Sequence, residues 1–188
     1  MVFSIFQPFV DIDVYHYIDF ICVKTEPETF GVKNSYAEPS QMGVDRWLAI
    51  LGANALYPNE TVIIVDSGTA TTVELLESNT HLGGWILPGI DMMYESLQSN
   101  TSKVIATPND ATAIELGTNT SDCVNNASVA ATVGLIELAK RLAFEKGHVE
   151  SRIILAGGNA QKLSPLLQTH NTVEPALIFY GMQRYGSN

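Results

Sequence analysis

Asp66 ends an apolar run and directly precedes a turn that is rich in hydroxyl groups. The stretch at residues 63–77 is IIVDSGTATTVELLE, so Ser67, Gly68 and Thr69 follow the acid. A glycine turn exposes backbone N–H groups and the hydroxyls add donors, which phosphate oxygens need, while a nearby carboxylate can hold a cation. An ordinary tight turn would use the same residues, because Gly and Asp favour turns and Thr favours strands.

A second polar cluster, Gly43-Val44-Asp45-Arg46, stands at the start of an amphipathic segment. Neighbouring helical positions point in different directions, so Asp45 and Arg46 would offer a carboxylate acceptor and a planar cationic donor to one polar ligand. The structural alternative is an acid that is favourable at a helix N-terminus, followed by a surface arginine.

One glycine pair precedes an apolar strand, and a second pair follows another apolar strand. GGWILPG at residues 83–89 implies close backbone contacts, and LAGGNA at residues 155–160 ends a strand in Gly157 and Gly158. A glycine pair lets the backbone approach a flat ligand such as a nucleobase, and it equally suits a simple turn.

These residues must be positioned by a mixture of strands and helices. Apolar runs and a three-to-four-residue apolar spacing predict an α/β fold with a mixed sheet, in which 25–42 is a connection and Thr120 caps the longest helix. The expected strands are 18–24, 61–77 (a strand-turn-strand unit), 81–89 and 152–158. The expected helices are 43–56, 90–101, 121–146 and 175–185.

Composition excludes several classes of protein. The 188 residues are 46% hydrophobic and carry a net charge of −10, without a Lys/Arg cluster, so a nucleic-acid-binding face is not expected. Cys22 and Cys123 have neither disulfide-framework nor metal-ligand spacing. The N-terminal stretch is interrupted by acids and indicates neither a signal peptide nor a membrane span, so a cytoplasmic protein is expected.

The order of the motifs resembles the type III pantothenate kinase family. GVDR, DSGTA, GGWILPG, LGTNT and the late glycine pair occur in the family's order and spacing over most of the chain from Tyr36 onward. The resemblance implies the mixed-sheet, ribonuclease H-like architecture of the actin/Hsp70/sugar-kinase superfamily. It also implies ATP-dependent phosphorylation of pantothenate to 4'-phosphopantothenate, the first step of coenzyme A biosynthesis.

The resemblance also implies roles for single residues on the substrate side. Asp45 would be the general base that accepts the hydroxyl proton of pantothenate, and Thr120 would reach the pantothenate of a neighbouring subunit in a homodimer. The other expected pantothenate contacts are Tyr36, Gly43, Val44 and Arg46.

On the nucleotide side, the resemblance makes Asp66 the ligand of a monovalent cation, potassium or ammonium. Gly68 and Thr69 would lie at the phosphates of ATP, which is bound with Mg²⁺, and Gly157 and Gly158 would lie against adenine. A cation at Asp66 together with Mg²⁺ would neutralise ATP locally in a net-negative protein.

The chain departs from the family pattern near its start. Family members carry a DxGNT phosphate loop ahead of the GxDR motif, and no such motif precedes Gly43 here. We therefore expect a truncated N-terminus with an incomplete first domain at residues 1–58, followed by a second α/β domain at residues 59–188. A missing phosphate loop would limit the kinase activity of the chain by itself.

Two other functions remain open from the sequence. The chain could be a non-catalytic family member that binds pantothenate or acts as a transcription-accessory interaction protein. It could also be another sugar or acid kinase of the superfamily, although GVDR together with LGTNT argues against this. Pantothenate, ATP and a second copy of the chain are the expected partners, and neither nucleic acid nor membrane is expected.

Overall fold

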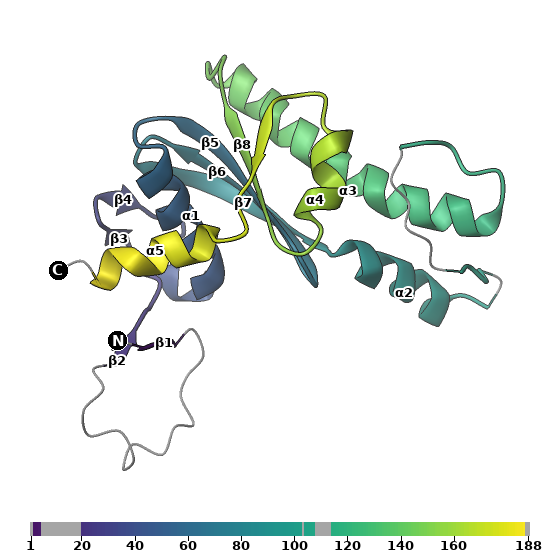
Figure 1. Ribbon diagram of the computed structural model, residues 1–188, viewed down its shortest axis with the longest axis horizontal. Coiled ribbons are helices and arrows are strands. Elements are labelled where there is room, and N and C mark those ends of the chain that lie inside the picture. Colours follow the sequence, from purple (N-terminus) through teal and green to yellow (C-terminus); the bar gives the residue numbers. More distant parts are fainter. Residues whose placement is uncertain (1, 5–19, 103, 108–113, 187–188) are drawn as a thin grey trace, which may run out of the picture.

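A seven-stranded mixed sheet lies at the centre of the molecule, between two layers of helices (Figure 1). The computed structural model describes residues 2–4, 20–102, 104–107 and 114–186. Within these ranges, no helix is long and apolar enough to cross a membrane.

The sheet has the strand order β3-β4-β7-β6-β5-β8-β9. β5, β6 and β7 follow one another as antiparallel neighbours, whereas β8 pairs in parallel with β5 and β9 with β8. β1 and β2 form a separate parallel pair. The mixed directions confirm the predicted α/β fold. The strand bounds are Val2–Ser4 (β1), Phe20–Cys22 (β2), Glu28–Thr29 (β3), Val32–Lys33 (β4), Thr61–Ser67 (β5), Ala70–Glu77 (β6), Thr80–Pro88 (β7), Arg152–Ala156 (β8) and Asn171–Val173 (β9).

Side-chain alternation along the central strands divides the core between the two layers. Val62 and Ile64 of β5 pack with α1 and α5 on one face, while Ile63 and Val65 pack with α3 on the other. The helices are Val44–Leu56 (α1), Ile90–Asn100 (α2), Thr120–Glu145 (α3), Ala160–Leu163 (α4) and Leu177–Gly186 (α5), with 3₁₀ turns at Pro39–Gln41 and Ser164–Leu166.

α1 and α5 touch through their backbones. A Cβ at Gly52 would lie 2.1 Å from the Leu177 carbonyl oxygen, and one at Gly181 would lie 2.1 Å from the Leu48 carbonyl oxygen. The two glycines therefore let α5 hold α1 tightly against the sheet, which fixes the position of the Asp45–Arg46 segment.

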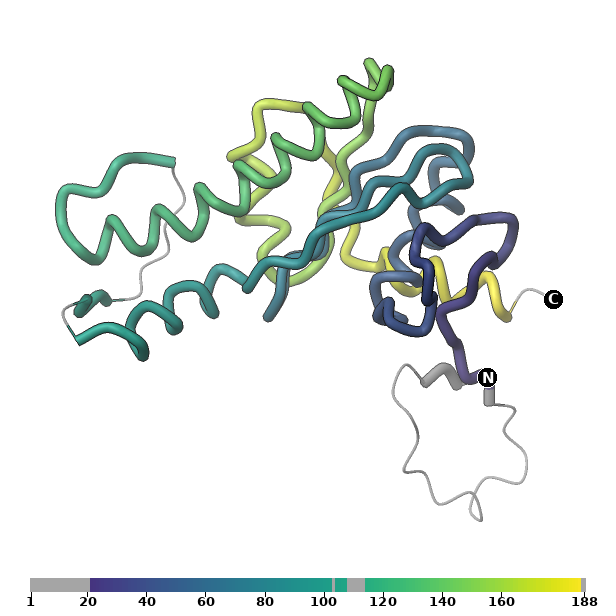
Figure 2. The backbone as a smooth tube through the Cα atoms, turned by 180° about the vertical axis from the view of Figure 1, so that it is seen from behind, coloured from purple at the N-terminus to yellow at the C-terminus, as the bar shows by residue number. Residues whose placement is uncertain are grey.

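α2 and the N-terminal half of α3 extend together beyond the sheet (Figures 1 and 2). Tyr94, Ala106 and Val124 form a small core between them, and the Tyr94 hydroxyl donates to the Ala106 carbonyl oxygen at 2.6 Å. This projection carries the LGTNT segment far from α1.

Most of the predicted elements are confirmed, with local corrections. The N-cap of α3 is Asn119, whose Oδ1 accepts from the Asp122 N–H at 3.0 Å, so the cap predicted at Thr120 is wrong by one residue. The 25–42 connection contains β3 and β4, and β9 was not predicted. The predicted strand at 18–24 is β2 within the described residues. The division at residue 58 stays a prediction.

Candidate active site

Several polar residues of the β5–β6 hairpin lie on the face of the sheet that carries α1. Asp66 pairs with Thr72, which in turn lies opposite Ile86. Directly opposed side chains share a face of the sheet, and Glu74 lies two residues from Thr72 on that same face. Ile86 is 63% exposed there, which leaves an apolar surface beside the polar residues.

The first turn of α1 presents Asp45 to solvent and Arg46 to the interior. The Asp45 Oδ1 accepts from the Arg46 N–H at 2.9 Å, and its carboxylate is exposed. A Cβ at Gly43 would lie 2.5 Å from this oxygen, so glycine at the N-cap leaves the room that the carboxylate occupies. Val44 is half-buried and packs against the small core of Val23, Leu48 and Met182.

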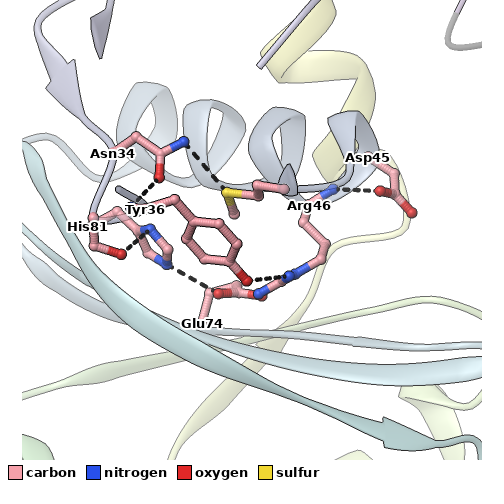
Figure 3. A network of polar contacts seen from close by, with 8 residues as sticks. Asn34, Tyr36, Asp45, Arg46, Glu74 and His81 are labelled. Carbon is pink, nitrogen blue, oxygen red and sulfur yellow. Dashed lines mark hydrogen bonds and ion pairs between the residues drawn. The ribbon is translucent and has the colours of Figure 1, made fainter. Parts of the chain in front are cut away.

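Arg46 is only 7% exposed, so the alternative of a surface arginine is wrong. Its Nε donates to Glu74 Oε1 at 2.6 Å, and its Nη2 lies 2.5 Å from the same oxygen. Its Nη1 donates to the Tyr36 hydroxyl at 2.9 Å (Figure 3). Tyr36 and Arg46, which the sequence predicts as substrate contacts, are therefore in direct contact.

Glu74 and His81 complete this network and were not predicted from the sequence. Each is 1% exposed, and His81 Nε2 lies 3.0 Å from Glu74 Oε2. Ser35 Oγ lies 3.0 Å from His81 Nδ1, and the Tyr36 ring stacks on the imidazole with centroids 6.3 Å apart. Glu74 stands between Val73 and Leu75 in β6, an alternation that is equally typical of a solvent-facing carboxylate, so the sequence carries no signal of its burial.

Glycine is required opposite Glu74. Gly84 is the cross-strand neighbour of Glu74, and a Cβ at Gly84 would lie 1.9 Å from Glu74 Oε2. The second glycine of GGWILPG therefore makes room for a buried carboxylate, a reason that the sequence pattern did not reveal.

The pKa values of Arg46 and Asp66 are both shifted from their ordinary values. Burial alone would lower the pKa of Arg46, but the hydrogen bond and charge of Glu74, with a smaller contribution from Tyr36, raise it above its ordinary value. The pKa of Asp66 is raised, first by burial and then by the negative charge of Asp45. The negative charge of Asp45 thus contributes to the environment of Asp66.

Asp66 is suited to a cation. Among the described residues, no group donates a hydrogen bond to its half-buried carboxylate, and burial makes the charged form unfavourable unless a positive charge compensates it. Asp66 was predicted as the ligand of a monovalent cation, and its environment fits one.

A cavity of about 440 Å³ opens beside the tip of the β5–β6 hairpin. Gly68 and Thr69 line it together with Gly158, so three of the four predicted nucleotide contacts lie in one place. The other residues that line it are Asp91, Met92, Glu95 and Asn159.

Gly157, the fourth predicted nucleotide contact, packs against the hairpin. Its φ is +83°, and a Cβ there would lie 2.4 Å from Asp66 Oδ1. Asn159, which was not predicted, donates its N–H to the Ser67 carbonyl oxygen at 2.9 Å and ties the loop after β8 to the hairpin tip.

Thr120 lies apart from the other predicted substrate contacts. It is the first residue of α3, exposed, and it stands on the projection at the end of α3 that is distant from α1 (Figure 1). The structure therefore does not bring Thr120 to the Asp45 face within one chain.

Comparison with known proteins gives one consistent result. Residues 9–141 match the family described as type III pantothenate kinase. The chain is 45% identical to the type III pantothenate kinase of Colwellia psychrerythraea, over 87% of this chain and 70% of that protein. It is 39% identical to that of Pseudoalteromonas translucida, over 81% of this chain and 63% of that protein.

Among solved structures, the fold is similar to that of a Campylobacter jejuni protein described as a Baf family transcriptional activator. The TM-score is 0.56 at 23% identity, over 84% of this chain and 65% of that one. This likeness concerns the fold. The chain thus spans between 63% and 70% of the length of these three proteins.

Proposed function

Because the chain belongs to the type III pantothenate kinase family, we propose that it binds pantothenate and ATP and transfers the γ-phosphoryl group to pantothenate. One observation carries the proposal. The expected base, Asp45, stands in the first turn of α1, and the expected cation ligand, Asp66, lies on the face of the sheet that carries α1, where burial and then the charge of Asp45 raise the pKa of Asp66. Acceptor and nucleotide would therefore meet between α1 and the hairpin tip.

On the acceptor side, Asp45 takes the proton of the attacking hydroxyl. Its exposed carboxylate is positioned by the Arg46 N–H, and phosphoryl transfer through a loose transition state requires mainly that the base be in place. Tyr36 and Arg46 contribute hydroxyl and guanidinium donors for the polar groups of pantothenate, and Gly43 and Val44 line the approach. Ile86 provides apolar surface on the same face.

On the nucleotide side, the hairpin tip receives the phosphates of ATP. Gly68 and Thr69 lie at the mouth of the cavity, and Gly158 offers an open backbone on which adenine can lie. Asp66 would hold a potassium or ammonium ion, and Mg²⁺ would arrive with ATP. When bound, these cations supply the positive charge that the acidic cavity wall lacks.

A homodimer is part of the proposal. The α2–α3 projection exposes Leu97, Ile105 and Leu116, the last at 97%, which favours burial against a second copy. Thr120 on this projection would then reach the pantothenate site of the other subunit. Sedimentation at micromolar concentration should give a dimer, and a monomer with an intact pantothenate site would contradict this arrangement. We place the reaction in the cytoplasm.

One experiment decides the function. The purified chain is titrated with pantothenate and with ATP·Mg²⁺ in a calorimeter, and phosphorylation of pantothenate is followed with and without potassium. Binding of both ligands with potassium-dependent turnover supports the kinase. Pantothenate binding without turnover favours the non-catalytic alternative, and absence of pantothenate binding contradicts both.

A further inference from the structure

Glu74 occupies a position that none of the expected catalytic roles explains. It is 1% exposed, comes from the middle of β6 and lies 28 residues from Arg46 in sequence. A buried carboxylate is costly unless it is paired and hydrogen-bonded, so Glu74 and the partners that compensate it must be considered as one unit.

Each oxygen of the Glu74 carboxylate has a separate partner. Oε1 accepts from Arg46 Nε and contacts Nη2, whereas Oε2 faces His81 Nε2 at 3.0 Å. A neutral imidazole that carries its proton on Nε2 satisfies this geometry, since the Ser35 hydroxyl can then donate to Nδ1. The carboxylate is thus held from both sides, and with it the plane of the guanidinium.

The held guanidinium still has unused donor capacity, since its buried Nη2 has no hydrogen-bond partner among the described residues. Nη1 uses one N–H for the Tyr36 hydroxyl, and the described residues offer no acceptor for its second N–H. In Figure 3, Tyr36 and Arg46 lie above Glu74, between His81 and the first turn of α1 that carries Asp45. The network therefore fixes the guanidinium of the residue that directly follows the expected base, while the Asp45 carboxylate points away from that guanidinium (Figure 3).

We propose that Glu74 is a positioning residue for the acceptor substrate: anchored by His81, it fixes the Arg46 guanidinium and, through it, the Tyr36 hydroxyl, so that their donors meet pantothenate next to Asp45. This inference rests on the proposed function. Gly84 is part of the same arrangement, because any side chain there would displace the Glu74 carboxylate.

A hydrolytic role for the Ser35, His81 and Glu74 chain is a poorer explanation. The three residues follow the order of a serine-histidine-acid triad, with separations of 3.0 Å at each step. The acid of a triad must stabilise a positive imidazolium, however, and here Arg46 already neutralises Glu74.

The test compares Glu74→Gln with Glu77→Gln. Glu77 lies on the same strand and pairs with His148 at 3.4 Å on a partly exposed surface, so its substitution removes the same charge away from Arg46. By calorimetry, Glu74→Gln should weaken pantothenate binding about 10–100-fold and leave ATP binding within about twofold. Glu77→Gln should change neither affinity by more than about twofold.

A double-mutant cycle separates positioning from general support of the fold. If Glu74 acts through Arg46, Glu74→Gln added to Arg46→Lys should weaken pantothenate binding by much less than it does alone. A structural role instead predicts a lower melting temperature with an unchanged pantothenate affinity. Should Glu74→Gln fail to fold, His81→Gln keeps the Glu74–Arg46 pair and should still weaken pantothenate binding.

The outcomes distinguish this inference from the proposed function. If the unchanged chain does not bind pantothenate, the proposed function fails and the inference falls with it. If the unchanged chain binds and Glu74→Gln, or His81→Gln in its place, binds equally well or more tightly, the inference alone is overturned.

Discussion

The acceptor side and the nucleotide side of the candidate site are built in opposite ways. Around Arg46, the guanidinium, the Glu74 carboxylate, the His81 ring and the Tyr36 hydroxyl are joined to one another, and only part of the guanidinium's donor capacity is left unused. Around Asp66, the carboxylate has no donor among the described residues, and the neighbouring cavity is lined largely by loop backbone and acids. Under the proposed function, one side is organised before its ligand arrives, whereas the other would be completed by the ligand and its ions.

The difference follows from what each ligand brings. ATP carries Mg²⁺ and a large negative charge, so a surface of backbone donors with an uncompensated carboxylate can be neutralised by ions on binding. Pantothenate brings no metal, and a fixed set of side-chain donors must recognise it at little ordering cost. Substitutions should therefore act differently on the two sides.

The largest expected effect is on catalysis at the acceptor side. Asp45→Asn should lower kcat about 10²–10⁴-fold, since the base is lost, while pantothenate affinity stays within a few fold. The asparagine Oδ1 can still accept from the Arg46 N–H, so the start of α1 should be preserved. Steady-state kinetics and calorimetry on the same protein measure both quantities. An unchanged kcat would remove Asp45 from the role of base.

Next in size is the loss of stability when the buried pair is broken. Arg46→Ala leaves Glu74 buried with only His81 beside it, which should cost about 3–5 kcal/mol in free energy of unfolding. Arg141→Ala is the control, because its pair with Glu145 is largely exposed and should contribute less than about 0.5 kcal/mol. Urea unfolding gives both values. Similar costs for the two variants would show that the acceptor side is no more organised than the surface.

Substitutions in the glycine pair after β8 should have smaller effects, one on stability and the other on ATP binding. Gly157→Ala forces a side chain into a left-handed conformation and against Asp66, and should cost about 1–3 kcal/mol. Gly158→Ala meets no atom within 4 Å, so stability should stay within about 0.5 kcal/mol while the methyl group enters the cavity and weakens ATP binding. If Gly158→Ala leaves ATP affinity unchanged, adenine does not lie there.

The two sides also differ in how far the sequence could predict them. The hairpin tip is contiguous in sequence, so one short stretch was enough to single out Asp66, Gly68 and Thr69 as candidates, although an ordinary turn would use the same residues. α1, β5–β7 and α3 carry long apolar patterns, and their existence was predicted correctly. The strands β3, β4 and β9 have two or three residues each and show no periodicity to detect.

The acceptor network escaped prediction because its contacts are long-range. Arg46 meets Glu74 and Tyr36 only after α1 has packed on the sheet, and an isolated Glu within a strand reads equally well as solvent-facing. The buried state of Glu74 depends on Gly84 of the next strand, which no single stretch encodes. The roles assigned through the family resemblance to Thr120 and the glycine pair stay predictions.

The smallest effect concerns Asp66 and separates a cation ligand from a turn-forming acid. Because burial and Asp45 raise the pKa of Asp66, the folded state holds the proton more tightly than the unfolded chain does. Its ionised form therefore reduces stability once the pH has risen through the folded pKa, and the penalty vanishes below the ordinary value of 3.8. Asp66→Asn should raise the melting temperature at pH 7 without potassium, and the gain should disappear as the pH falls below that value.

Potassium should reduce the destabilisation that the ionised Asp66 carboxylate causes at pH 7. A cation on Asp66 compensates the buried charge, so added potassium should raise the melting temperature of the unchanged chain at pH 7 and tighten its ATP binding. Asp66→Asn should abolish both responses, and an equal concentration of tetramethylammonium serves as the control for ionic strength. A turn-forming aspartate predicts the reverse, a loss of about 0.5–2 kcal/mol in the variant with its potassium response intact. That result would leave the nucleotide side without its cation ligand and remove the contrast between the two halves of the site.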